Sequence, residues 1–207
     1  MTRIAVLVSG GGTNLQTLID AEQRGELEGG HIVLVVSSSN QAYALERAKR
    51  ANIDTALIRR KDYANAGRFD AAVEETITAY QIDLVVLAGY LSIIGPRTLS
   101  RYEGRIINVH PSLIPSFCGK GFYGLRVHEA ALEYGVKVTG ATVHLVSEVV
   151  DGGKILLQKA VAVEEGDTPE TLRRRVMEQA EWELLPKAVA MLCKQADATS
   201  ERGTENG

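Results

Sequence analysis

The sequence has few cysteines, no long apolar run and no excess of positive charge, and each shortage argues against a class of protein. Its two cysteines, Cys118 and Cys193, provide neither a disulfide framework nor metal-site spacing, so the reducing cytoplasm is the expected compartment. The apolar run at residues 4–8 is far shorter than a membrane span and has no signal-peptide cleavage pattern, so we expect a buried strand there. A net charge of −3 argues against a broad basic face. We therefore expect neither a membrane nor a nucleic acid as a partner.

The length and composition are those of one globular domain. The chain has 207 residues, of which 45% are hydrophobic and 24% are charged, and it contains no internal repeat. From residue 196 to residue 207 the sequence, ADATSERGTENG, is polar and contains glycine, which predicts a disordered tail. The folded domain is therefore expected to span residues 1–195.

Strand and helix patterns alternate through the first half of the chain. Short, almost continuously apolar runs occupy residues 3–9, 31–37, 55–58 and 83–88, as expected of strands that are covered on both faces. Between them, residues 14–23, 42–50 and 68–80 have helical patterns with charged outer faces. This order predicts a single-domain, Rossmann-like α/β fold with a mostly parallel sheet and helices on both faces.

The second half departs from this alternation. A helix is expected at residues 127–134, followed by strands at 139–146 and 154–163 with no helix between them, which predicts an antiparallel C-terminal addition at the sheet edge. Thr168, Pro169 and Glu170 are typical of a helix start, with a cap, a proline at the first position and an acid in the first turn. We expect this last helix to run to about residue 194, with a bend near Pro186.

One short segment presents two polar side chains at the end of an apolar run. Residues 105–107 lead in as a strand, and with a period of two, Asn108 and His110 project from the same face. Pro111 ends the strand there, because it has no N–H for the sheet and disfavours helix at the preceding residue. In open α/β sheets, ligand sites lie at the carboxyl ends of strands. An isolated Asn-x-His would favour a purely structural role, with the Asn capping a turn and the His half-buried, but the frame of Pro111 and Pro115 shifts the balance toward a site.

Three consecutive glycines, residues 10–12, follow the first strand and lead into the first helix through Thr13 and Asn14. Glycines allow positive φ and a close approach of the backbone to a ligand, while a helix start offers unpaired amides, so the loop suits a phosphate. The pattern lacks the Gly-Lys-Ser/Thr of the P-loop and the third glycine of the dinucleotide fingerprint, where Leu15 stands. The alternative is a tight turn capped by Thr13 or Asn14.

Asp151 precedes a pair of glycines between the two late strands, a pattern typical of a hairpin turn. An aspartate close to a histidine would instead raise the imidazole pKa and make a proton donor available near neutral pH. Of the other histidines, we assign His31, at a strand start, and His128, on the short helix, to structure. His144 alternates within its strand and is a candidate to support the site from behind.

Taken in order, residues 9–15, residues 107–115 and the Asp-Gly-Gly at 151–153 resemble the glycinamide ribonucleotide formyltransferases, folate-dependent transformylases of purine synthesis. The resemblance covers roughly residues 1–194. The Asn-x-His-Pro-Ser-Leu-x-Pro motif is shared by other enzymes that use 10-formyltetrahydrofolate, so it indicates formyl-folate chemistry. The glycine loop and the lack of an added N- or C-terminal domain favour the glycinamide ribonucleotide branch.

The resemblance implies a role for each segment. The co-substrate would be 10-formyltetrahydrofolate and the acceptor glycinamide ribonucleotide, both small molecules, with no metal, and the protein would be a monomer or a homodimer. Catalysis is assigned to Asn108, His110 and Asp151. The acceptor phosphate is assigned to Gly11, Gly12, Thr13 and Asn14, its ribose to Glu181, and the folate to Tyr90, Leu91, Ser92, Ile93, Ile94 and Asn108.

The implied chemistry suits these residue types. An amine that attacks a formyl carbon creates an oxyanion, which a neutral amide and a cationic imidazole can stabilise. The amine loses a proton and the folate nitrogen gains one before it leaves, so a histidine whose pKa is raised by Asp151 is suited to moving the proton. Asn108 and His110 would supply both groups from one strand face.

Several positions depart from the family pattern. Ser92 stands where many relatives have arginine, Ala66 occupies the region of a second arginine, with Arg68 nearby, and Trp182 replaces a histidine. The departures at Ser92 and Trp182 leave open a catalytically inactive nucleotide-binding protein, and formyl transfer to another amine or hydrolysis of formyl-folate also stay open. The glycine-rich loop at residues 116–124 has two interpretations, a lid over the site or a mobile surface loop with its aromatics tucked back.

Overall fold

The structure is a computed structural model that describes the backbone of residues 1–204 and the side chains of residues 1–196. The described residues form a seven-stranded sheet in the order β3-β2-β1-β4-β5-β6-β7. The strands β1 to β5 pair in parallel, whereas β6 is antiparallel to β5 and to β7. The bounds are β1 Thr2–Val8, β2 Gly30–Ser37, β3 Asp54–Leu57, β4 Leu84–Leu87, β5 Ile106–His110, β6 Val138–Leu145 and β7 Ile155–Ala162. The expected α/β fold with an antiparallel edge addition is confirmed.

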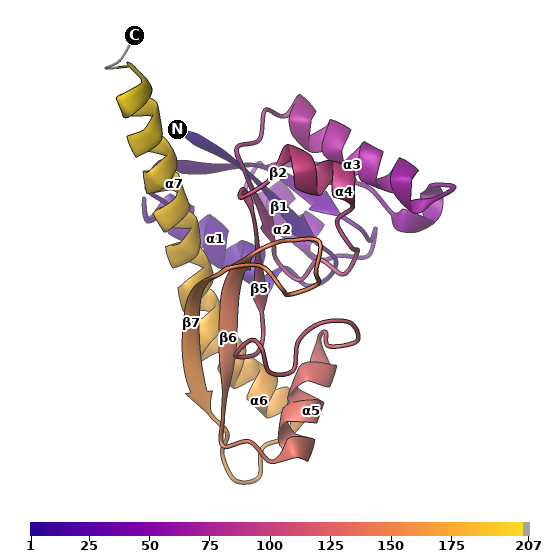
Figure 1. The fold of residues 1–207 in the computed structure, drawn as a ribbon, viewed down its shortest axis with the longest axis vertical. Helices are drawn as coiled ribbons and strands as arrows, with labels where there is room; N and C mark the ends of the chain where they lie inside the picture. The colour runs from indigo at the N-terminus through magenta and orange to yellow at the C-terminus, as the bar shows by residue number, and fades with distance from the viewer. Residues whose placement is uncertain (205–207) are drawn as a thin grey trace.

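Helices cover both faces of this sheet (Figure 1). They are α1 Thr13–Gln23, α2 Ala44–Arg50, α3 Ala66–Ala79, α4 Pro96–Arg101, α5 Leu125–Tyr134, α6 Pro169–Val176 and α7 Trp182–Thr204, with a 3₁₀ turn η1 Arg60–Asp62 and a π turn η2 Met177–Glu181. The sequence patterns did not predict α4, whose six residues are too few to show a helical period. Within the described part of the chain, none of the helices has both the length and the apolar character that a membrane span requires.

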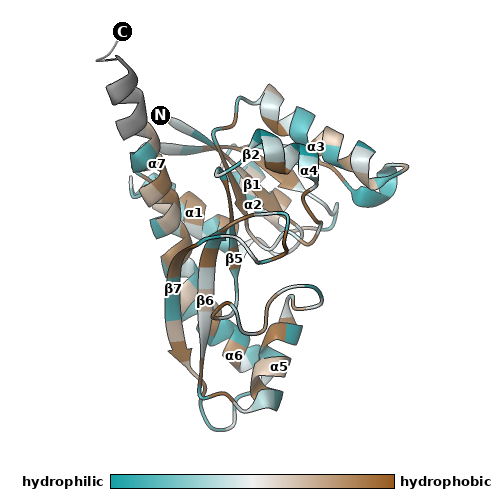
Figure 2. Cartoon of the chain, in the orientation of Figure 1, coloured by the Kyte–Doolittle hydropathy of each residue, from teal (hydrophilic) through white to brown (hydrophobic). Residues whose placement is uncertain are grey.

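The central strand β1 shows why a separate hydrophobic core lies on each face of the sheet. Successive side chains of a strand point to opposite faces, so Ile4, Val6 and Val8 pack with the helices α1, α6 and α7, whereas Ala5 and Leu7 pack with α3. All five side chains are fully buried. The strands β1 and β4 are accordingly apolar along most of their length, whereas the edge strand β7 has polar bands and the helices have polar outer faces (Figure 2).

The sheet order places three strand ends beside one another. β4 lies between β1 and β5, and all three run in the same direction, so the chain leaves β1 after Val8, β4 after Leu87 and β5 after His110 at one edge of the sheet. The end of β5 carries Asn108 and His110, and the segments that follow β1 and β4 carry residues predicted to bind phosphate and folate. The fold therefore gathers them at the carboxyl ends of the strands, where open α/β sheets bind ligands.

The C-terminal helical region differs from its prediction. Thr168 caps α6 through a hydrogen bond from the Thr171 amide, as expected for a capping residue. The helix is interrupted at η2, one turn before the bend predicted near Pro186, and Pro186 lies inside α7. The helix also continues to Thr204, past both the predicted end at about residue 194 and the start of the predicted tail. Residues 205–207 lie outside the described part, and disorder of the tail stays a prediction.

Candidate functional site

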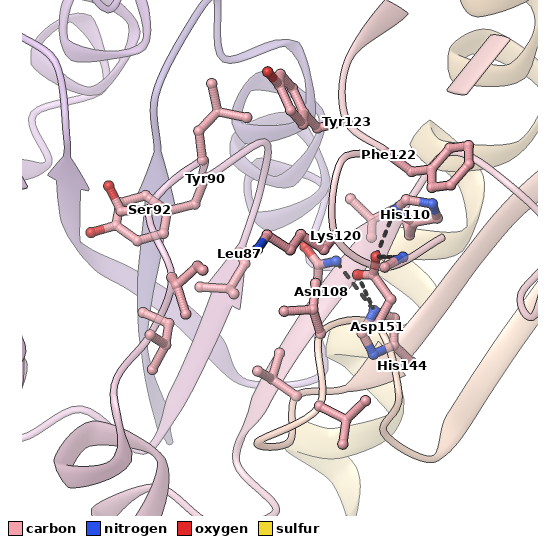
Figure 3. Close-up of a pocket in the computed structure, with 18 of the residues that line it drawn as sticks. Leu87, Tyr90, Ser92, Asn108, His110, Lys120, Phe122, Tyr123, His144 and Asp151 are labelled. Carbon is pink, nitrogen blue, oxygen red and sulfur yellow. Dashed lines mark hydrogen bonds and ion pairs between the residues drawn. The ribbon is translucent and has the colours of Figure 1, made fainter. Parts of the chain in front are cut away.

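A cavity of ≈ 560 Å³ opens at the carboxyl ends of β4 and β5 (Figure 3). Four segments supply its lining, within residues 87–94, 108–111, 119–124 and 144–151. The four are far apart in the sequence, and they are the end of β4 with the segment after it, the end of β5, the glycine-rich loop and the β6–β7 connection. Both predicted strand-end side chains, Asn108 and His110, line the cavity.

Strand β5 delivers these two side chains to one place. Asn108 is half-buried and His110 is 4% exposed, and the strand ends at His110, directly before Pro111. The alternation along the strand therefore presents an amide and an imidazole to the same cavity, as the period of two predicts.

Asp151 joins these residues from the β6–β7 connection. Its Oδ2 lies 3.6 Å from Nδ1 of His110, and its Oδ1 lies 3.6 Å from Nε2 of His144. The backbone amide of Gly119 donates to Oδ2 at 2.8 Å. Burial by itself raises the pKa of Asp151, but the contacts with His144, Gly119 and His110 outweigh it and hold this pKa below its usual value. The aspartate therefore faces both histidines as a carboxylate.

The pKa of His110 corrects one expectation. Burial lowers this pKa below its ordinary value, although the hydrogen bond to the carbonyl of Phe117 and the charge of Asp151 act in the opposite direction. The prediction that Asp151 raises the pKa of His110 overall is therefore wrong, because the loss of water around the ring outweighs the effect of the nearby carboxylate. Nε2 of His110 donates to Phe117 O at 2.9 Å, since a carbonyl can only accept. In the neutral ring the lone pair is then on Nδ1, the atom that faces Asp151.

His144 fixes the orientation of Asn108. Nδ1 of His144 lies 2.9 Å from the carbonyl oxygen of Leu145, which can only accept, so that nitrogen holds the proton. In the tautomer that leaves Nε2 unprotonated, Nε2 accepts from Nδ2 of Asn108 at 3.2 Å. The Asn108 amide has two N–H groups, and this contact uses one of them. The second N–H is left for a ligand in the cavity.

The glycine loop begins α1 without a side-chain cap. Gly12 is the N-cap with φ 72°, and no side chain donates or accepts a capping hydrogen bond there. The alternative interpretation, a turn capped by Thr13 or Asn14, is therefore wrong. The hydroxyl of Thr13 lies 3.3 Å from Sδ of Met177, and Nδ2 of Asn14 donates to Glu181 at 2.7 Å. The first amides of α1 remain available to an anion.

Glu181 lies beneath this loop, at the end of the π turn η2. Its side chain is 8% exposed, and burial raises its pKa above the usual value, partly offset by the hydrogen bond from Asn14. The neighbouring Trp182 also has a buried indole N–H, which has no hydrogen-bond partner among the described residues. A single π turn in a helix is frequent at functional sites, and here it brings a buried carboxyl group against the predicted phosphate loop.

The segment after β4 forms one wall of the cavity. The five residues of this segment that were predicted to contact folate, Tyr90 to Ile94, all line it. Leu91 and Ile93 are 64% and 75% exposed, and burial raises the pKa of Tyr90 to about 12. The amide of Leu91 donates to the hydroxyl of Ser9 at 2.8 Å, which links this wall to the glycine loop. Neither Ala66 nor Arg68 belongs to the lining.

The loop at residues 116–124 is attached to the site. Phe117 accepts from His110 and Gly119 donates to Asp151. The ring of Phe117 packs edge-on against Phe122 and Tyr134, with centroid distances of 6.4 Å and 6.0 Å. Phe117 is therefore tucked back, whereas residues 119–124 line the cavity and Tyr123 is 49% exposed. A lid movement of this loop stays a prediction.

Some site groups were missed by the sequence analysis. The backbone groups of Phe117 and Gly119 form hydrogen bonds with His110 and Asp151, and only the glycine content of the loop indicated a close backbone approach.

His128, assigned to structure, is 1% exposed, and neither ring nitrogen has a hydrogen-bond partner within the described residues. Burial, with smaller contributions from Arg173 and His110, lowers the pKa of His128 to about 4. Across residues 1–196, no group of three His, Cys, Asp or Glu side chains is arranged to hold a metal ion.

Comparison with known proteins gives a consistent picture. The sequence model of one family, described as formyl transferase, matches residues 2–189. The chain is 42% identical over 201 residues to the trifunctional purine biosynthetic protein adenosine-3 of Bos taurus, covering 97% of this chain and 19% of that protein. It thus spans about a fifth of the length of the first trifunctional relatives it matches.

Relatives of similar length are also found. The phosphoribosylglycinamide formyltransferase of Haemophilus influenzae is 41% identical over 189 residues, which are 91% of this chain and 86% of that protein. The crystal structure of glycinamide ribonucleotide transformylase 1 from Symbiobacterium toebii has a TM-score of 0.88 and 44% identity, and the match covers 94% of this chain and 89% of that one.

Proposed function

The chain belongs to the formyl transferase family, and from this premise we propose that it transfers a formyl group from 10-formyltetrahydrofolate to the glycine amine of N1-(5-phosphoribosyl)glycinamide. The products would be the N-formyl compound and tetrahydrofolate, in de novo purine (IMP) biosynthesis. The observation that carries this proposal is the contact of Asp151 with His110 beside Asn108, at the base of a largely apolar cavity. The names of the relatives of similar length support the same reaction.

Asn108 is proposed to stabilise the oxyanion that forms when the amine attacks the formyl carbon. One of its N–H groups is held by His144, so the other is oriented before the substrates arrive. A donor that is already oriented stabilises the developing charge without reorganisation, and a single donor of this kind is worth about 10²–10³ in kcat.

His110 is proposed to move the proton. Its lowered pKa keeps the ring neutral near pH 7, so Nδ1 can accept a proton from the attacking amine. The imidazolium so formed would be stabilised by the carboxylate of Asp151, 3.6 Å away, and would then return the proton to the departing folate nitrogen. Positioned acid–base catalysis of this kind contributes about 10²–10⁴-fold.

Substrate binding is proposed to use two separate subsites. The acceptor phosphate would bind Gly11, Gly12, Thr13 and Asn14 at the uncapped start of α1, with Glu181 at the ribose. The folate would lie along residues 90–94, where exposed apolar side chains and backbone groups suit a flat, partly polar ring. The Ser9–Leu91 hydrogen bond joins the subsites and fixes their spacing.

We further propose that the protein acts in the cytoplasm on these small molecules, as a monomer or a homodimer, without a metal. The proposal of the reaction is tested by incubating purified protein with 10-formyltetrahydrofolate, with and without glycinamide ribonucleotide. Tetrahydrofolate should form only when the acceptor is present. Consumption of formyl-folate at the same rate without the acceptor would mean hydrolysis instead.

The variant His110→Asn separates an enzyme from a protein that only binds these compounds. We expect its turnover to fall by about 10²-fold or more while the affinity for each substrate stays within about threefold. If the wild type binds both compounds but, like the variant, shows no turnover, the protein is a binding protein and not an enzyme.

A further inference from the structure

Lys120 is the only lysine or arginine among the described residues that line the cavity. Its side chain is exposed, and no described carboxylate forms an ion pair with it. In Figure 3 the side chain extends from the glycine-rich loop into the cavity rather than away from it. The site thus has one unpaired cation whose role is not accounted for by the catalytic scheme.

The backbone holds Lys120 in a defined position. The residue is second in a turn closed by a hydrogen bond from the Phe122 amide to Gly119 O, at 3.1 Å. Its neighbours Gly119 and Gly121 have φ values of 86° and 98°, a region that favours glycine. Because the Gly119 amide also donates to Asp151, the turn that presents the ammonium group is fixed to the catalytic centre.

The charges around the cavity indicate what Lys120 binds. The acidic residues of the lining are Glu148 and Asp151, so apart from Lys120 the wall would repel an anion. The acceptor phosphate is assigned to the start of α1, whose first residues are not part of this lining. The remaining anionic group among the proposed substrates is the glutamate part of the folate, which has two carboxylates and lies at the end remote from the pterin.

On these grounds, and resting on the proposed function, we propose that Lys120 binds a carboxylate of the folate glutamate and makes the enzyme selective for folates that have it. An exposed ammonium group at the cavity suits a ligand group that stays partly hydrated. The neighbouring exposed apolar side chains, Leu91, Ile93 and Val149, suit the aromatic part between the pterin and the glutamate.

The expected change in KM is small because the ammonium group of Lys120 is exposed to solvent. Exposed ion pairs are weak and are screened by salt, so loss of Lys120 should raise the KM for the folate by about two- to fivefold at low ionic strength. The difference should shrink as the salt concentration rises. Because Lys120 is not assigned to the reacting atoms, kcat should change by less than about twofold.

The test compares Lys120→Met with the wild type on two co-substrates, 10-formyltetrahydrofolate and the N-methylamide of 10-formyltetrahydropteroate, which has neither the glutamate nor a free carboxylate. We expect the variant to lose affinity for the first and not for the second, so that its preference between them disappears. Lys120→Arg should restore most of the preference. Lys137→Met, which removes an exposed lysine that does not line the cavity, is the matched control and should behave as the wild type.

Three results would overturn the assignment. An equal rise in KM for both co-substrates would mean that Lys120 affects binding of the pterin ring or the structure of the loop. A fall in kcat for both would mean that Lys120 acts at the reacting atoms. Unchanged kinetics would mean that Lys120 has no role in folate binding. If the wild type shows no acceptor-dependent turnover at all, the proposed function fails by itself. Calorimetric titration of the two folates into the wild type and Lys120→Met then still decides whether Lys120 recognises the glutamate.

Discussion

Oδ2 of Asp151 lies 3.6 Å from Nδ1 of His110 and accepts the backbone amide of Gly119 at 2.8 Å. One carboxylate oxygen therefore connects the end of β5, the β6–β7 connection and the glycine-rich loop. Because the second oxygen faces His144, Asp151 is held from several sides and can stabilise a proton on His110 without moving.

Removal of the Asp151 charge should impair catalysis more than binding. In Asp151→Asn, we expect kcat to fall by about 10²-fold or more, because the imidazolium loses its carboxylate, while the KM of each substrate changes by less than about threefold. Steady-state kinetics with each substrate varied in turn measure both effects. Glu165→Gln, which changes an exposed acid away from the cavity, is the control. An Asp151→Asn enzyme with full kcat would exclude the proposed role.

The pH dependence of catalysis should reflect the lowered pKa of His110. The ring must be neutral to accept a proton, so kcat/KM should be at its plateau at pH 7 and should fall only below about pH 6.5, the ordinary pKa of histidine. Asp151 opposes the lowering, so in Asp151→Asn the residual activity should have this acid limb at still lower pH. An acid limb above pH 7 in the wild type would contradict the burial argument.

His128 should make the fold sensitive to acid. Its pKa is about 4 in the folded chain, so the unfolded chain, with a histidine pKa of about 6.5, binds the proton more readily. The contribution of neutral His128 to the free energy of unfolding is therefore fully present above about pH 6.5. It falls by on the order of 3 kcal/mol as the pH drops toward 4.

Urea unfolding at pH 7 and pH 4.5 measures this contribution. In His128→Leu, the loss of unfolding free energy between the two pH values should be smaller than in the wild type by about 2–3 kcal/mol. Equal losses in the two proteins would show that His128 is not buried in its neutral form.

Gly12 should be required for the start of α1. Its φ is 72°, and a Cβ at this position would lie 2.6 Å from the Cβ of Ala44 and 2.8 Å from its Cα. Gly12→Ala should therefore lower the unfolding free energy by about 1–3 kcal/mol and weaken binding of the acceptor phosphate. Gly10→Ala is the control for stability, because a Cβ there meets no atom within 4 Å. Equal stabilities for the two variants would contradict the packing against Ala44.

Local patterns in the sequence predicted the parts of the site that lie on single elements. The period of two along β5 and the block at Pro111 are sufficient to place Asn108 and His110 together. The glycine loop before α1 is likewise a local feature of the sequence, although the sequence left open whether Thr13 or Asn14 caps the helix. These are short-range relationships, and the strand and helix order that follows from them is confirmed.

Features that depend on long-range packing were not predictable in the same way. The sign of the His110 pKa shift depends on how many groups bury the ring, which no pair of residues in the sequence reveals. The interruption at η2 was also missed, because a π turn changes the helical period for only one turn. The hydrogen bonds from the glycine-rich loop to the site are made by backbone groups, which leave no mark on residue type.

The most direct measurement of the central claim follows the formyl carbon itself. With 10-formyltetrahydrofolate labelled with ¹³C in the formyl group and glycinamide ribonucleotide as acceptor, the ¹³C NMR signal should move to a formamide of the acceptor in the wild type. The transfer should be slower by about 10²-fold or more in His110→Asn. Appearance of the label as free formate, or equal transfer rates in the two proteins, would contradict formyl transfer by Asn108, His110 and Asp151.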